Sequence, residues 1–170
     1  GVATLSEVLE AFPGVVLNLD IKRTAPEVTS YERLLASELR EHGRTDDVLV
    51  ASFSDAATAE FTKWAPEVAI VAGTDATTEF YNRVQAGAPA QDDIGRFVAL
   101  QPPARLGPLT VVDERFVKAA HSSGLAVHVW TVDEPREMEH LVNIGADGII
   151  SDTPSVLAAE LGRLGANWKL

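Results

Sequence analysis

Three polar side chains at every second position of one apolar segment are the strongest chemical signal in the sequence. The segment covers residues 15–22, and the three residues are Asn18, Asp20 and Lys22. Because successive side chains of a strand point to opposite faces, an amide, a carboxylate and an amine would share one face. Burying unpaired charges is costly, so such a row is expected to be paired, hydrated or bound to a ligand. We therefore interpret this face as one wall of an active site.

Further polar residues stand at or near the ends of other apolar segments. Gln101, Trp130 and Asp152 occupy such positions in three separate parts of the chain. Side chains from the carboxyl ends of several parallel strands commonly form the active site of a barrel. The candidate site is thus expected to draw on more than one strand.

The elements that must position these residues alternate regularly between strand and helix. A capping box predicts a helix over residues 4–12. Apolar strands are predicted to start near residues 15, 48, 68, 97, 126 and 147. The helices between and after them are predicted at 31–42, 54–64, within 77–95, at 114–123, at 133–145 and from 153 onward. This order predicts an α/β protein with a parallel sheet.

Two architectures fit this order: an open doubly wound sheet and a (β/α)8 TIM barrel. No glycine-rich fingerprint follows any of the strands, and the polar residues gather at strand ends, which favours the barrel. Six βα units, however, do not close an eight-stranded barrel.

Composition narrows the class of protein. The chain has 170 residues, 46% of them hydrophobic, which predicts one domain with one core. Its net charge of −11 disfavours nucleic acid as a partner. The absence of cysteine excludes disulfides and thiolate chemistry, and no apolar run is long enough to span a bilayer.

Four motifs resemble, in order and spacing, those of the glycerophosphodiester phosphodiesterases. They are Leu17-Asn18-Leu19-Asp20-Ile21-Lys22, Val50-Ala51-Ser52-Phe53, Val127-His128-Val129-Trp130-Thr131-Val132-Asp133 and Gly145-Ala146-Asp147-Gly148-Ile149-Ile150-Ser151-Asp152-Thr153-Pro154. The resemblance covers essentially the entire chain, and its most specific part runs from residue 124 to residue 154.

The resemblance implies a TIM barrel that hydrolyses glycerophosphodiesters to glycerol 3-phosphate and an alcohol with the help of a divalent cation. Asp20 matches the family's metal-binding position, where a glutamate is usual, and the cation is expected to be calcium or magnesium, with manganese as a further option. Lys22 matches the lysine that holds phosphate oxygens and offsets transition-state charge. Trp130 matches an aromatic residue beside the substrate, and Gln101 is a further candidate for a substrate contact.

Several of the family's functional residues have no counterpart in this sequence. They are the two catalytic histidines, in a His-Arg and a His-Asp pair, and the second strand's glutamate and aspartate, which complete the metal site. All of them precede the helix that begins near Thr4, and the first residue is Gly1 rather than methionine. We therefore expect residues 1–170 to be the C-terminal portion of one barrel domain, roughly its last six βα units, and to be inactive in isolation.

Each candidate residue also has a plain structural interpretation. Asp20 and Lys22 can form a simple ion pair, Trp130 can pack in the core, and Asp152 is expected to cap the last helix. Two further residues, His128 and Trp64, are expected to be core residues. Three histidines are expected to face solvent and three acidic residues to be solvated surface charges, all without a role: His42, His121, His140, Asp92, Asp93 and Glu134.

Two rival functions remain open: a non-catalytic barrel that binds a phosphorylated metabolite, and an open α/β interaction domain. If the barrel is incomplete, its exposed strand edges are expected to cause self-association or pairing with the missing N-terminal segment. We expect a cytoplasmic location, and secretion stays open because the N-terminus is taken to be missing.

Overall fold

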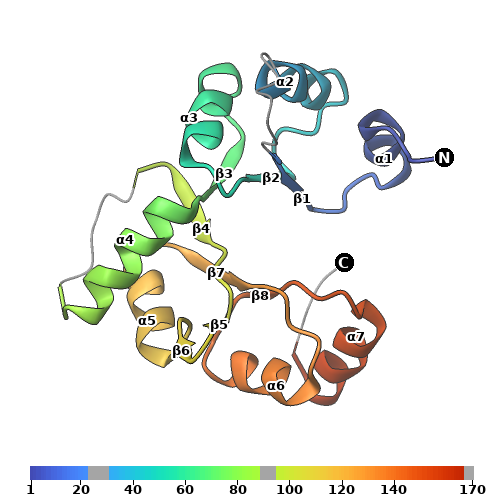
Figure 1. Ribbon diagram of the computed structural model, residues 1–170. Coiled ribbons are helices and arrows are strands. Elements are labelled where there is room, and N and C mark those ends of the chain that lie inside the picture. Colours follow the sequence, from blue (N-terminus) through green and yellow to red (C-terminus); the bar gives the residue numbers. More distant parts are fainter. Residues whose placement is uncertain (23–30, 89–94, 167–170) are drawn as a thin grey trace. The chain divides into compact units, whose positions relative to one another are not determined.

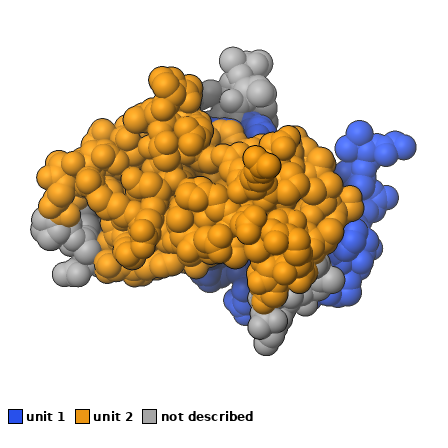
Figure 2. Space-filling model, turned by 90° about the horizontal axis from the view of Figure 1, so that it is seen from below, with its two compact units in different colours: residues 1–76 blue, residues 77–170 orange. Residues whose placement is uncertain are grey.

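The computed structural model describes residues 1–22, 31–88 and 95–166. This part of the chain divides into two units, residues 1–76 and 77–170, which are coloured separately in Figure 2. In both units, parallel strands alternate with helices (Figure 1). None of the helices in the described ranges is both long and apolar enough to span a lipid bilayer.

The first unit contains three parallel strands in the order β1-β2-β3. Its elements are α1 (Leu5–Ala11), β1 (Leu17–Asp20), α2 (Tyr31–Glu41), β2 (Val48–Ala51), α3 (Asp55–Trp64), β3 (Ala69–Ala72) and the first turn of α4 (Thr74–Gln85). In the register, Leu17 pairs with Val48 and Asp20 with Ala51. Helices α2 and α3 pack against each other, and α3 contacts β3. The buried side chains of this unit include Leu35, Leu39, Val48, Val50, Phe61 and Ile70.

Helix α1 begins at the predicted capping box. The Thr4 hydroxyl accepts a hydrogen bond from the amide of Glu7, and the Glu7 carboxylate accepts one from the amide of Thr4 at 2.7 Å. The hydrogen bonds from Thr4 hold the pKa of Glu7 below its ordinary value. The predicted helix start is confirmed.

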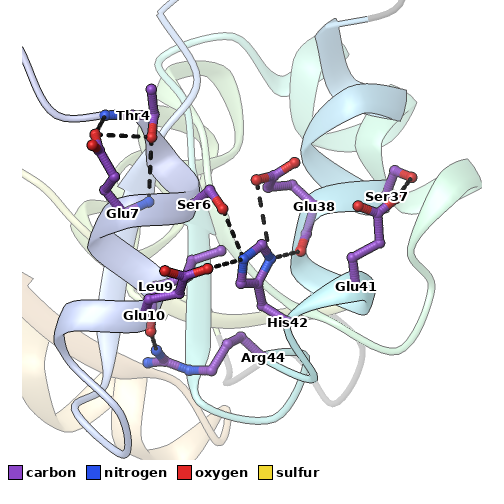
Figure 3. Close-up of polar contacts among 10 residues, drawn as sticks. All are labelled: Thr4, Ser6, Glu7, Leu9, Glu10, Ser37, Glu38, Glu41, His42 and Arg44. Carbon is purple, nitrogen blue, oxygen red and sulfur yellow. Dashed lines mark hydrogen bonds and ion pairs between the residues drawn. The ribbon is translucent and has the colours of Figure 1, made fainter.

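His42 is not the solvent-facing residue that was expected. Its side chain is 18% exposed, and it lies between α1 and α2 (Figure 3). Its Nε2 contacts the hydroxyl of Ser6 at 2.9 Å, and its Nδ1 contacts the carbonyl oxygen of Glu38 at 2.9 Å. The expectation failed because a helical pattern does not reveal that a second helix covers this face.

The second unit contains three parallel strands in the order β4-β7-β8. Its elements are most of α4, then β4 (Phe97–Leu100), β5 (Arg105–Leu106), β6 (Leu109–Thr110), α5 (Glu114–Ser122), β7 (Ala126–Val129), α6 (Pro135–Asn143), β8 (Gly148–Ile149) and α7 (Pro154–Arg163). Ala99 pairs with Ala126, and His128 pairs with Gly148. Buried side chains include Leu100, Phe116, Val117, Val127, Val129, Met138 and Leu141.

Two local predictions were wrong. The helix expected within residues 77–95 starts earlier, because Thr74 and Asp75 already belong to α4, which continues to Gln85. Trp64 was expected in the core, but it is 42% exposed. Its indole nitrogen donates to the carboxylate of Glu60, and the guanidinium of Arg33 lies over its ring. Asp92 and Asp93 lie outside the described residues.

Candidate active site at the strand ends

Asp20 and Lys22 lie together at the carboxyl end of β1. Asn18 and Asp20 are exposed along the strand, while Ile21 is buried, so the predicted alternation of polar and apolar side chains is confirmed. The ammonium group of Lys22 forms an ion pair with the carboxylate of Asp20. The Lys22 side chain is 67% exposed and that of Asp20 is 32% exposed. The pair is therefore open to solvent and accessible to a charged ligand.

A buried hydroxyl fixes the backbone that carries this pair. The amide of Ile21 donates to the carbonyl oxygen of Ala51 at 2.8 Å, which extends the pairing of β1 with β2. Ser52 is buried, and its hydroxyl donates to the carbonyl oxygen of Ile21 at 2.8 Å. Because the backbone on either side of Ile21 is held in this way, Asp20 and Lys22 project from a rigid segment.

Phe53 belongs to this group of residues and was not singled out from the sequence. The ammonium nitrogen of Lys22 lies 5.3 Å from the centroid of the Phe53 ring, within the range of a cation–π contact. Phe53 is 56% exposed. Its backbone is held in place, because its carbonyl oxygen accepts a hydrogen bond from the amide of Thr74. The available signal in the sequence was an aromatic residue two positions after the end of an apolar strand.

Gln101 and Trp130 contact each other at the carboxyl ends of β4 and β7. The indole nitrogen of Trp130 donates to the carbonyl oxygen of Gln101 at 2.5 Å. An isolated parallel bridge joins Pro103 to Trp130, and the Trp130 amide donates to the carbonyl oxygen of Pro102. Both side chains are half-buried. The structure thus joins two of the predicted site residues.

His128 lies on β7, two residues before Trp130, and is half-buried. Its Nδ1 lies 3.1 Å from the side-chain nitrogen of Gln101. Burial lowers the pKa of the His128 imidazole, and the charge of Asp147 opposes that shift. This agrees with the expectation of a hydrogen-bonded core histidine rather than a solvated one.

The carboxylates of two aspartates hold the segments that follow β3 and β8. Asp55, the first residue of α3, accepts hydrogen bonds from the amides of Gly73 and Asp75 at 3.1 and 2.8 Å. Asp133, before α6, accepts hydrogen bonds at 2.8 Å from the Ser151 hydroxyl and the Asp152 amide, and these lower the pKa of Asp133. The predicted capping role of Asp152 is wrong, because Thr153 is the N-cap of α7 and its side chain makes no capping bond.

The site residues supply only part of what a divalent cation needs. Calcium takes six to eight oxygen ligands and magnesium six. Within residues 1–22, 31–88 and 95–166, no cluster of three or more acidic, histidine or cysteine side chains is able to hold a metal ion. Asp20 is the one predicted ligand, and it is paired with Lys22. The described residues therefore do not make a metal site by themselves.

The predicted site residues form two pairs, one in each unit. Asp20 and Lys22 belong to the first unit, whereas Gln101 and Trp130 belong to the second. Each pair lies at the carboxyl end of parallel strands, the end at which barrel enzymes hold their active sites.

Solved structures with a similar fold are phosphodiesterases. A glycerophosphoryl diester phosphodiesterase by name, from Silicibacter pomeroyi DSS-3, matches with a TM-score of 0.75 and 24% identity over 97% of this chain and 58% of that chain. An Oleispira antarctica phosphodiesterase, solved in complex with the product sn-glycerol-3-phosphate, matches with a TM-score of 0.63 and 18% identity over 93% of this chain and 60% of that chain. The fold class is therefore the (β/α)8 barrel of the phosphodiesterase type rather than an open sheet, represented here by six βα units.

Sequence comparison defines the family. The model of the glycerophosphoryl diester phosphodiesterase family matches residues 1–156. A Mycobacterium tuberculosis protein that carries the name glycerophosphodiester phosphodiesterase 2 is 34% identical over 165 residues, which are 92% of this chain and 58% of that protein. The chain belongs to the glycerophosphoryl diester phosphodiesterase family, a family of hydrolases. It spans about 58% to 60% of the length of the curated relatives that it matches.

Proposed function

We propose that the whole protein hydrolyses glycerophosphodiesters to glycerol 3-phosphate and an alcohol. The observation that carries the proposal is the solvent-open pair of Lys22 and Asp20 on a rigid strand end, in a chain of this family. A phosphodiester is an anion, and an accessible ammonium group is suited to bind its oxygens. The names of the relatives and the glycerol 3-phosphate bound to one structural neighbour support the same substrate class.

The proposed roles follow from chemistry and position. Lys22 binds phosphate oxygens and offsets the negative charge that develops in the transition state. Trp130 presents an aromatic surface to the substrate, and Gln101 contacts it through its side-chain amide. Asp20 is proposed as one carboxylate ligand of a divalent cation, calcium, magnesium or manganese, whose other ligands the described residues do not supply.

The isolated chain of 170 residues is proposed to be inactive. Hydrolysis of this kind needs one group that activates the attacking oxygen and another that protonates the leaving alkoxide. Among the described residues at the strand ends, Lys22 is paired with Asp20, and His128 is engaged with Gln101. Neither pair provides both functions.

The organisation of the chain is also a proposal. The family match runs through both units, which supports treating residues 1–170 as part of a single phosphodiesterase domain. In the described part of the sheet, β1 pairs with β2 on one side and with no strand on the other. We propose that this edge permits self-association or pairing with a further segment.

The test is release of glycerol 3-phosphate from glycerophosphocholine by the whole protein, with and without EDTA. Release that EDTA abolishes is expected. Lys22→Met is expected to lower kcat/KM by roughly a hundredfold or more. Lys118→Met is the matched control, because Lys118 pairs with Glu114 on the exposed surface of α5. Binding of glycerol 3-phosphate without any release would instead favour a non-catalytic binding protein, and activity of the isolated chain would overturn the proposal about the fragment.

A further inference from the structure

The buried hydroxyl of Ser52 joins the segments that follow β1 and β2 in the first unit. Ser52 is 6% exposed. Its hydroxyl donates a hydrogen bond to the carbonyl oxygen of Ile21 at 2.8 Å and accepts one from the amide of Ser54 at 3.1 Å. A hydroxyl that donates one bond and accepts another has a defined orientation. The two segments are therefore held together by a single side chain.

The first of these bonds holds the peptide group that leads into Lys22. In the register of β1 and β2, the pairing runs as far as Asp20 and Ala51. Beyond this pair, the amide of Ile21 donates to the carbonyl oxygen of Ala51, and the carbonyl oxygen of Ile21 accepts the Ser52 hydroxyl. Rotation of that peptide group would turn the backbone of Lys22. The direction in which Lys22 leaves the strand therefore depends on Ser52.

The second bond holds the peptide group between Phe53 and Ser54. The amide of Ser54 donates to the Ser52 hydroxyl, and the carbonyl oxygen of Phe53 accepts a hydrogen bond from the amide of Thr74 at 3.0 Å. Both polar atoms of this peptide group are thus held. The Phe53 ring that it carries lies with its centroid 5.3 Å from the ammonium nitrogen of Lys22. Ser52 therefore also supports the aromatic group that Lys22 contacts.

Lys22 needs such support because its side chain is 67% exposed. A lysine carries its charge on a flexible chain of four carbons, and an exposed ion pair holds that chain only weakly. Two groups that contact the ammonium, the Asp20 carboxylate and the Phe53 ring, are carried by the two segments that Ser52 joins. Ser52 and Ile21 are themselves buried, so we expect the hydroxyl to act through Lys22 and not on the substrate directly.

We propose that Ser52 is a positioning residue whose hydroxyl directs the ammonium group of Lys22 toward the phosphate oxygens of the diester. This inference rests on the proposed function and adds a residue to the same site. Preorganised charges stabilise a transition state only when they are held where its charge develops. Displacing such a group by about 1 Å can cost a hundredfold in rate. A buried hydroxyl that does not contact the substrate can therefore control the rate.

The first test measures the placement of Lys22 in the whole protein without any substrate. In NMR spectra of protein with ¹³C-labelled lysine, the Lys22 side-chain signal is identified by its loss in Lys22→Met. The Phe53 ring is expected to shift this signal away from that of an exposed lysine such as Lys118. Ser52→Ala is expected to move it toward the Lys118 signal, because the ring and the ammonium are no longer held together. A Lys22 signal that is unchanged in Ser52→Ala would overturn the inference.

The second test is a double-mutant cycle in the whole protein, with glycerophosphocholine as substrate. Ser52→Ala alone is expected to lower kcat/KM roughly tenfold, because Lys22 is no longer directed at the phosphate. In the Lys22→Met background the same change is expected to cost less than about twofold, because the group through which Ser52 acts is gone. A residue that only stabilised the fold would cost the same factor in both backgrounds.

Two further variants make the comparison specific to the Ser52 hydroxyl. Ser52→Thr keeps the hydroxyl and is expected to keep most of the activity. Thr58→Val is the matched control, because Thr58 is a buried residue of α3 in the same unit, and its hydroxyl donates to the carbonyl oxygen of Asp55 at 3.1 Å. If circular dichroism shows that Ser52→Ala does not fold, Ser52→Cys replaces it with the same expectations, because its thiol fills the site and is only a weak donor.

The outcomes separate the inference from the function on which it rests. Wild-type protein that releases no glycerol 3-phosphate would refute the proposed function, and the catalytic consequence of Ser52 with it. Active wild-type protein combined with an unchanged kcat/KM in Ser52→Ala would refute the inference alone. Equal losses with and without Lys22 would assign Ser52 a merely structural role and also overturn the inference. A loss in Ser52→Thr as large as that in Ser52→Ala would show that the hydroxyl is not the group responsible, with the same consequence.

Discussion

The ammonium group of Lys22 contacts a carboxylate and an aromatic ring at the same time. Both the ion pair with Asp20 and the contact with Phe53 are open to solvent. Exposed ion pairs contribute about 0–1 kcal/mol to stability, so this pair adds little to the stability of the fold. The same weakness means that a substrate phosphate can replace the carboxylate as partner of Lys22 at little cost. At the scale of single residues, the pair is therefore better explained by binding than by folding.

Asp20→Asn distinguishes these two explanations. We expect the free energy of unfolding to change by less than about 1 kcal/mol, because the pair is exposed. We expect kcat/KM of the whole protein to fall by about a hundredfold, because the carboxylate is proposed to bind the divalent cation. Urea unfolding measures the free energy of unfolding, and the glycerol 3-phosphate assay measures kcat/KM. A large loss of stability with unchanged activity would show that Asp20 is a structural residue.

His42 is expected to make the attachment of α1 dependent on pH. The hydrogen bond to the Glu38 carbonyl is the main cause that raises the pKa of His42, and the charges of Glu38 and Glu10 add to it. A folded-state pKa above the ordinary 6.5 stabilises the folded protein fully below about pH 6.5. This contribution is lost as pH rises through the folded-state pKa.

The measurement is the free energy of unfolding of the wild type and of His42→Gln across this pH range. The difference between them is expected to be largest at acidic pH and to shrink as pH rises. In NMR titrations, Glu10→Gln is expected to lower the pKa of His42. Glu41→Gln is the control, because the Glu41 carboxylate accepts a hydrogen bond from Ser37 and does not contact the imidazole. A difference in stability that grows with pH would contradict this account.

At the scale of elements, one buried arginine fixes the entry into the strand that carries the site. Arg44 is 6% exposed, and its guanidinium donates to the carbonyl oxygens of Leu9, Phe12 and Val15 at 2.9, 3.1 and 2.7 Å. It also donates to both carboxylate oxygens of Asp47. These contacts join the end of α1 and the start of β1 to the loop before β2.

Arg44→Met is expected to lower the free energy of unfolding by about 3–5 kcal/mol, the usual cost of breaking a buried charged pair. Lysine cannot reproduce the planar array of donors, so Arg44→Lys is expected to recover only a minor part of the loss. Arg40→Met is the matched control, because Arg40 pairs with Glu67 on the exposed surface, where the loss of an ion pair is expected to change stability little. Equal losses in Arg40→Met and Arg44→Met, measured by urea unfolding, would refute the proposed role of Arg44.

The elements that the sequence failed to predict depend on contacts between distant residues. The capping box at Thr4 and the exposed face of β1 follow from local spacing and were predicted. The start of α4 was missed because the carboxylate that holds its first turn belongs to Asp55, 20 residues before Asp75. Two-residue strands such as β5 and β6 are too short to produce a periodic pattern.

The same limit applies to the candidate site. The pairing of Asp20 with Lys22 was considered from their spacing on one strand, and the structure contains it. The contact between Gln101 and His128 depends on the register of two strands whose residues are 27 positions apart. No local pattern specifies such a register, so the sequence indicated Gln101 only through its position at a strand end.

At the scale of the whole molecule, the edge of β1 determines how the isolated chain is expected to behave in solution. The described part of the sheet leaves the backbone groups along one side of β1 without a partner strand, and such edges recruit other chains. Next to this edge, Val16 is an apolar side chain that is 66% exposed. An apolar, unpaired edge of this kind favours association between copies of the chain.

The average mass of the isolated chain in analytical ultracentrifugation is therefore expected to rise with protein concentration. Val16→Lys is expected to reduce this rise, because a charged side chain beside an edge strand opposes pairing. Val156→Lys is the control, since Val156 is an exposed valine that belongs to a helix, α7, and not to an edge strand. A wild-type chain that stays monomeric over the whole concentration range would refute self-association. Association that Val16→Lys and Val156→Lys weaken equally would mean that charge alone, and not the β1 edge, controls it.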